Sequence, residues 1–101
     1  MSNGPVALSD QSFLAATPDG EVMVRVAVKG HVLGVQLEPE VMRRPGHEIA
    51  ERIMACADVA YLQGQLALRQ QMQQANVDPV CYEDMPVEQD LVAARERLRK
   101  L

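Results

Sequence analysis

One segment limits the possible folds of this chain more than any other. Between residues 21 and 29, valine occupies every second position, and the positions between hold Glu21, Met23, Arg25, Ala27 and Lys29. Side chains in a β-strand alternate between its two faces, so this spacing places all the valines on one face. β-Branched residues also favour the pleated surface of a sheet. The segment therefore predicts a strand with one face on a core and the other partly in solvent.

The segments on either side predict two further strands. Order begins near Ser12, and residues 13–17 form a short apolar segment, after which Pro18-Asp19-Gly20 is a turn signal. Gly30 marks a second turn, after which residues 32–37 place Leu33, Val35 and Leu37 on one face. Short turns join the strands, so we expect an antiparallel meander. The sheet should end at Pro39, because proline has no backbone N–H group to donate to a neighbouring strand.

Two helices are expected after the sheet. Residues 41–44 are a linker or helical turn, and from His47 to about Gln74 the apolar residues recur at helical spacing. A second, shorter helix begins near Pro86, with a narrow apolar seam at Val87, Leu91, Ala94 and Leu98. The predicted fold class is α+β: a three-stranded antiparallel meander, a long helix and a shorter C-terminal helix. Its parts are an N-terminal arm (1–11), a sheet-plus-helix domain (12–75), a loop (76–85) and a terminal helix (86–101).

The net charge and the composition limit the functions that this protein could have. The net charge is −4 and aromatic residues make up 3% of the 101 residues. These values disfavour a generic polybasic nucleic-acid binder and nearly exclude sites that stack bases on several rings. No secretory signal and no membrane-spanning stretch is visible, which predicts a cytoplasmic protein without a membrane partner.

The sequence offers no catalytic or metal-binding constellation. It lacks the common nucleophile-elbow, zinc-protease and phosphate-loop motifs. His31 and His47 fall on different elements, and Cys56 and Cys81 have no standard zinc spacing. Cys56 falls on the apolar helix face, as a small buried residue would. We expect no catalytic residue, no metal and no cofactor, and therefore no enzyme.

The surface offers two features. The apolar helix surface is large for three short strands, which favours a homodimer; the alternative is that the terminal helix folds back over the surplus. Candidate interface residues are Val22, Val24, Tyr61, Leu68, Val87, Leu91 and Leu98. The second feature is a set of basic residues, either phosphate contacts or a solvated helix end: Arg43, Arg44, Arg95, Arg97, Arg99 and Lys100.

The sheet and the long helix resemble a known family. Residues 20–30 resemble the V-x-V-x-x-x-G strand of the YbaB/EbfC nucleoid-associated proteins, and residues 32–40 resemble their next strand, which ends in Asp-Pro or Glu-Pro. Residues 48–60 resemble their long helix. The resemblance, over residues 20–72, implies an α+β homodimer that binds DNA with little sequence preference and without a cofactor.

Two details refine this resemblance. Residues 12–17 are similar to actinobacterial members, including a mycobacterial member associated with type VII secretion. Family members usually begin with a long charged helix, which residues 1–11 cannot supply, and the helix at 86–101 would replace it. The expected function is weak, low-specificity DNA binding by a non-enzymatic, nucleoid-associated homodimer. The alternative is a protein-interaction accessory module of an actinobacterial type VII secretion system.

Overall fold

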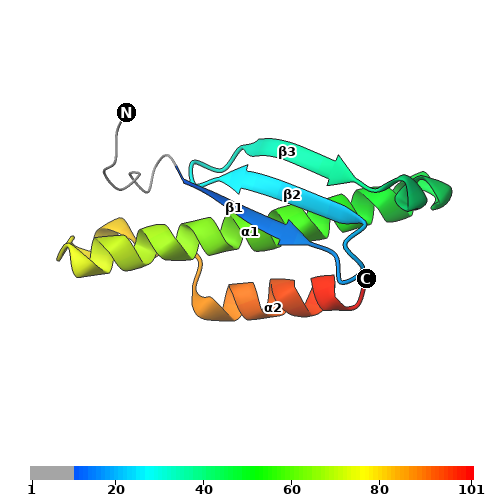
Figure 1. Ribbon diagram of the computed structural model, residues 1–101. Helices are drawn as coiled ribbons and strands as arrows, with labels where there is room; N and C mark the ends of the chain where they lie inside the picture. The colour runs from blue at the N-terminus through cyan, green and yellow to red at the C-terminus, as the bar shows by residue number, and fades with distance from the viewer. Residues whose placement is uncertain (1–10) are drawn as a thin grey trace, which may run out of the picture.

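The computed structural model describes residues 11–101 and has the predicted α+β fold. Three strands are followed by a long helix and a shorter C-terminal helix (Figure 1). The strands and α-helices are β1 (Ser12–Ala16), β2 (Val22–Ala27), β3 (Val32–Leu37), α1 (Gly46–Gln74) and α2 (Glu88–Arg99). Two 3-10 helices lie in the connections, η2 (Pro39–Arg43) and η3 (Pro79–Cys81).

The sheet is the expected antiparallel meander, with β2 in the centre and the order β1-β2-β3. Val22, Val24 and Val26 face the core and are almost fully buried. The β1–β2 turn depends on Gly20, whose φ of +76° is the left-handed region that glycine adopts readily. The Asp19 carboxylate supports the turn by accepting hydrogen bonds from the Thr17 hydroxyl at 2.7 Å and the Glu21 amide at 3.0 Å.

The long helix α1 covers one face of the sheet, where it packs on β2 and β1 (Figure 1). Cys56, Val59 and Ala60 form the centre of its buried face. Near Gly64 the backbones approach closely: a Cβ there would lie 3.5 Å from the Cα of Val28 and 3.4 Å from the Phe13 ring. The small size of residue 64 thus lets the helix lie close to the sheet, because there is room for no more than a methyl group.

The C-terminal helix α2 packs on α1 and makes few contacts with the sheet (Figure 1). Leu91, Ala94 and Leu98 are buried, so the apolar seam faces α1 of the same chain. At the start of α2, the Asp90 carboxylate accepts a hydrogen bond from the Val87 amide at 2.8 Å and caps the helix. The terminal helix therefore folds back, which was the alternative interpretation of the sequence.

The element boundaries differ slightly from the sequence prediction. The central strand is shorter than residues 21–29 because the turn at Gly30, whose φ is +107°, already begins at Ala27. The segment 41–44 belongs largely to the 3-10 helix η2, and α2 begins at Glu88 and not at Pro86. The predicted N-terminal arm lies outside the described residues, except for Gln11, whose carbonyl accepts a hydrogen bond from the Val28 amide at 3.1 Å.

Candidate functional site

Arg44, one of the predicted DNA contacts, lies in a cluster of carboxylates. Its guanidinium is 3.6 Å from Asp19, 3.3 Å from Glu21 and 3.4 Å from Glu48. The hydrogen bond that it donates to Glu21 is the main reason that the pKa of Arg44 is raised above its usual value. The cluster joins the β1–β2 turn to the start of α1. The positive charge of Arg44 is thus compensated inside the chain, which argues against its predicted role as a phosphate contact.

The basic residues of α2 divide into two kinds. Arg99 donates a hydrogen bond from Nε to Glu96 at 3.0 Å, and Lys100 lies 4.0 Å from the same carboxylate. Within residues 11–101, Arg95 and Arg97 form no ion pair, and both are exposed. Arg43, in η2, is also exposed and makes no ion pair with a described residue. Of the six predicted basic residues, Arg43, Arg95 and Arg97 are therefore the ones whose charge no described carboxylate compensates.

The structure does not gather the six basic residues into one patch. Arg97 and Lys100 line a shallow cavity together with Glu51 and Asp58 of α1. Arg95 lines a different groove, on the side of α2 that faces β1. Positive and negative side chains thus alternate over this part of the surface, which differs from the continuous basic surface of a strong nucleic-acid binder.

Four of the predicted interface residues are interior residues of a single chain. Val22 and Val24 are 0% exposed beneath α1, and Leu91 and Leu98 are buried between the two helices. The prediction that these four contact a partner is therefore wrong, because their apolar surface is already covered within the chain. Tyr61 and Val87 are exposed and Leu68 is half-buried, so these three remain available.

The largest group of exposed apolar side chains on one described element lies on β3, where the sequence analysis placed no interface residue. All six residues of β3 are exposed, and its four large apolar side chains, at 32, 33, 35 and 37, are between 37% and 52% exposed. The register sets Leu37 opposite Val22 and Val35 opposite Val24. Residues directly opposite share a face of the sheet, so β3 extends the core face. It stays exposed because α1 packs on β1 and β2 and hardly reaches β3.

The outer edge of β3 also carries free backbone groups. The Glu38 amide donates to the Glu21 carbonyl, so residues 38 and 21 form a hydrogen-bonded pair of the ladder. Bonded and non-bonded pairs alternate in antiparallel sheets, so Val35 and Leu37 direct their N–H and C=O groups away from β2. The alternating valines of the neighbouring strand indicated which face is buried, but only the position of α1 shows that β3 is left uncovered.

The chemically reactive residues are dispersed. His31 and His47 are exposed on separate elements, and no group of three or more His, Cys, Asp or Glu residues within 11–101 could hold a metal ion. Cys56 is fully buried, and burial raises the pKa of its thiol to about 11. Among the described residues, no helix combines the length and the apolar character needed to cross a membrane.

Comparison with known proteins places the chain in a family without an assigned function. A family model described as "Protein of unknown function (DUF2694)" matches residues 7–101. No curated protein and no solved structure matches the chain. The surfaces described above are therefore the basis for any functional assignment.

Proposed function

Since this chain belongs to the DUF2694 family, we propose that it is a non-enzymatic interaction protein that works as a homodimer joined through β3. The observation that carries the proposal is the exposed apolar face of β3, which continues the core face of the sheet past the reach of α1. Exposed apolar patches of this kind are typical of protein–protein contacts.

The free edge of β3 is suited to pairing with a second copy of itself. Natural edge strands are usually protected by lysine, proline or inward-pointing charges, and residues 32–37 contain none of these. Two β3 strands related by a two-fold axis would pair antiparallel, with the backbone groups of Val35 and Leu37 completing the ladder. The two sheets would then form one continuous sheet, and the apolar side chains of both β3 strands would cover one another.

Light scattering after size-exclusion chromatography tests this proposal. The wild-type protein should elute with twice the 11.2 kDa mass of one chain, and Val35→Lys should elute as a monomer. A charge at this position would be desolvated in the dimer but stays in solvent in the single chain. Val80→Lys is the matched control, because Val80 is an exposed apolar residue on η3, distant in sequence from β3.

Two results would contradict the dimer. The first is a wild-type protein that elutes as a monomer at all concentrations. The second is a Val35→Lys variant that stays dimeric with an unchanged circular dichroism spectrum. Leu33→Lys is a second β3 variant, useful if Val35→Lys does not fold.

Low-specificity DNA binding is the second candidate function, and the exposed, uncompensated charges of Arg43, Arg95 and Arg97 favour it. The resemblance to YbaB/EbfC proteins supports the same function, and a dimer would carry each arginine twice. The affinity for a generic duplex should then fall steeply between about 50 and 200 mM salt, as fluorescence anisotropy would measure. The double variant Arg43→Glu/Arg97→Glu should lose this binding, whereas Arg44→Gln should change it little. Equal binding by both variants would exclude this route to DNA.

The resemblance also names a class of protein partner, a component of a type VII secretion system. A protein partner would use the same exposed apolar surfaces as the dimer. If the protein binds such a component, substitutions of exposed residues on β3 or α2 should weaken the binding, and Arg43→Glu/Arg97→Glu should not. This result would favour a protein partner over DNA.

A further inference from the structure

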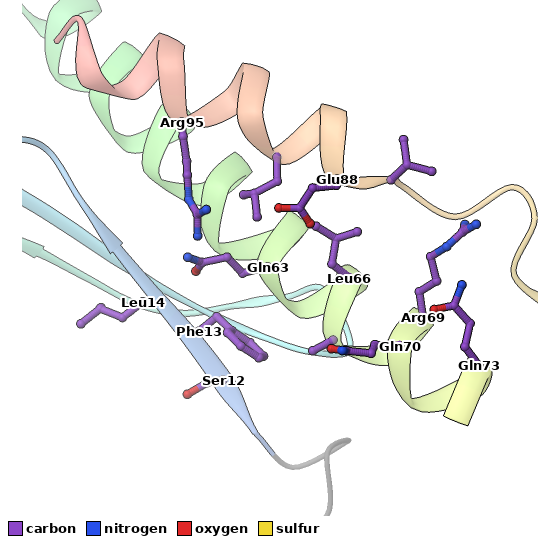
Figure 2. Close-up of a pocket in the computed structure, with 13 residues that line it drawn as sticks. Ser12, Phe13, Leu14, Gln63, Leu66, Arg69, Gln70, Gln73, Glu88 and Arg95 are labelled. Carbon is purple, nitrogen blue, oxygen red and sulfur yellow. The ribbon is translucent and has the colours of Figure 1, made fainter. Parts of the chain in front are cut away.

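A groove of about 680 Å³ runs between β1, α1 and α2, on the side of the molecule opposite to β3. Its apolar lining includes Phe13 of β1, Leu66 of α1 and Leu91 of α2. Figure 2 shows β1 on one side of the groove and α2 on the other, with the α1 residues between them. The groove is therefore bounded by a strand edge and a helix, and floored by a second helix.

The edge of β1 that faces away from β2 carries free backbone groups. The Gln11 carbonyl accepts from the Val28 amide, and the Thr17 amide donates to the Val22 carbonyl. Residues 11 and 17 thus form hydrogen-bonded pairs with β2, and by alternation so do Phe13 and Ala15. The N–H and C=O groups of residues 12, 14 and 16 consequently point outward, and none of them bonds another segment within residues 11–101.

The charges around the groove are predominantly positive. Arg69 and Arg95 line it, and Glu88 is the one carboxylate among the described residues that do so. Arg69 is held in place, since it donates to the carbonyls of Tyr82 at 2.7 Å and Met85 at 3.2 Å, and these neutral groups leave its charge uncompensated. Arg95 points from α2 toward Gln63, as Figure 2 shows. This local excess stands out on a chain whose net charge is −4.

We propose that this groove binds an extended segment of a partner protein, in which apolar and acidic side chains follow one another on the same face, and that the segment adds to β1 as a fourth strand. The outward N–H and C=O groups of β1 would bond its backbone, as in other cases of strand addition. Because side chains alternate along a strand, one set would face α1 and α2, where its apolar members would lie on Leu66 and Val87 and its acidic members would reach the guanidinium groups. The site is independent of the proposed dimer, because β1 and β3 are the opposite edges of the sheet.

A labelled synthetic peptide tests the site directly. The probe carries valine and glutamate in turn at every second position, with threonine between them, over about eight residues, enough to pair with the whole of β1. Its controls are the same peptide with lysine in place of each glutamate, and the glutamate peptide with every second amide methylated, which cannot donate to a strand edge. In fluorescence anisotropy only the unmodified glutamate peptide should bind saturably.

Two matched charge-reversal variants of α2 test whether the peptide binds in this groove. Arg95→Glu should weaken binding of the glutamate peptide by about tenfold or more, because a charge-assisted contact becomes a repulsion. Arg97→Glu, which changes the charge equally on the same helix outside the groove, should leave the affinity within about twofold. In NMR spectra of the ¹⁵N-labelled protein, the amides of residues 12, 14 and 16 should shift on binding and those of residues 32–37 should not.

Several outcomes would overturn the proposal. They are the absence of saturable binding by the glutamate peptide, equal affinity for the lysine or the methylated peptide, and equal effects of Arg95→Glu and Arg97→Glu. NMR shifts confined to β3 would place the peptide at the other edge. If the peptide converts a dimer into a monomer, the natural occupant of the groove is a second copy of this chain and not a partner segment.

Discussion

At the scale of single residues, the two thiols of this chain differ in accessibility. Cys56 is fully buried in α1, and its Sγ donates to the Val22 carbonyl at 3.7 Å. Burial, which disfavours the thiolate, raises its pKa to about 11. Cys81 lies exposed on η3. Cys56 therefore contributes to packing, and Cys81 is accessible to reagents in solution.

We expect one thiol to react quickly in the folded protein. A colorimetric thiol reagent at about pH 8 should label one thiol per chain in buffer and two in concentrated guanidinium chloride, because only the thiolate of an accessible cysteine reacts. Cys81→Ser should abolish the fast phase and Cys56→Ala should preserve it. Fast labelling of Cys56 in buffer would show that α1 does not cover this position in solution.

The Asp19 carboxylate connects a turn with the Arg44 cluster. The Glu21 amide, the Thr17 hydroxyl and then Arg44 stabilise its charged form, so its pKa lies below the usual 3.8. Because the pKa of Asp19 is lower in the folded protein than in the unfolded chain, the charged carboxylate stabilises the fold at pH values above its unfolded pKa. This stabilisation is lost as the pH falls through the pKa of the folded protein. The cluster should therefore weaken in acid.

Thermal denaturation between about pH 6 and about pH 3 measures this effect. The melting temperature of the wild-type protein should fall more steeply below about pH 4 than that of Asp19→Asn, whose side chain does not titrate. The control is Asp84→Asn, because the Asp84 side chain forms no hydrogen bond or ion pair within residues 11–101. Parallel curves for wild type and Asp19→Asn would mean that the turn carboxylate is not stabilised by folding.

At the scale of the elements, α1 depends on a close contact with the sheet at Gly64. Glycine lowers helix propensity by about 1 kcal/mol relative to alanine. A Cβ at this position would meet the Phe13 ring at 3.4 Å, which is contact and not overlap, but a longer side chain would strike the backbone of Val28. The space at residue 64 is thus limited to a methyl group.

Two substitutions at Gly64 should therefore have opposite effects. Gly64→Ala should be neutral or raise the unfolding free energy by up to about 1 kcal/mol. Gly64→Leu should lower it by about 1–3 kcal/mol through overpacking. Gly46→Leu, at the open start of the same helix, is the control and should change little, since a Cβ at residue 46 would have no neighbouring atom within 4 Å. Urea denaturation followed by circular dichroism gives all three values.

The packing of α2 on α1 should be sensitive to the shortening of a single buried side chain. Leu91→Ala should cost about 2–5 kcal/mol because Leu91 is buried at the centre of the helix pair. Val92→Ala, on the exposed side of the same helix, should cost less than about 0.5 kcal/mol. Limited proteolysis of the loop at 76–85 should also become faster in Leu91→Ala only. Similar losses in both variants would mean that α2 does not pack through this seam.

At the scale of the whole molecule, the fold is thin and one-sided. Its extents are 49 × 38 × 18 Å, the shortest of which corresponds to one sheet and one layer of helices. A single helix crosses the sheet, so it cannot cover all three strands. The exposed β3 follows from this shape. Residues 11–101 therefore leave the apolar side chains of β3 exposed, and the proposed dimer would cover them.

Dimerisation through β3 would link stability to concentration. The melting temperature of the wild-type protein should rise as protein concentration increases from about 1 µM to about 100 µM, because association favours the folded state by mass action. Val35→Lys should show a lower melting temperature that does not depend on concentration. Differential scanning fluorimetry with an external dye suits this chain, which lacks tryptophan. A concentration-independent melting temperature for the wild type would contradict the dimer.

The sequence alone determined the fold class and the order of the elements. Valine alternation, the turns at Gly20 and Gly30, and the helical spacing after Pro45 are local signals, because each depends on the backbone geometry of a few neighbouring residues. Partner surfaces are different, since exposure depends on which elements pack on one another. Only the tertiary structure decided that α1 covers β1 and β2 but not β3, and that α1 also covers Leu91, Ala94 and Leu98 of α2. For the same reason only the folded chain shows that carboxylates surround Arg44, and that Arg69 and Arg95 line the same groove.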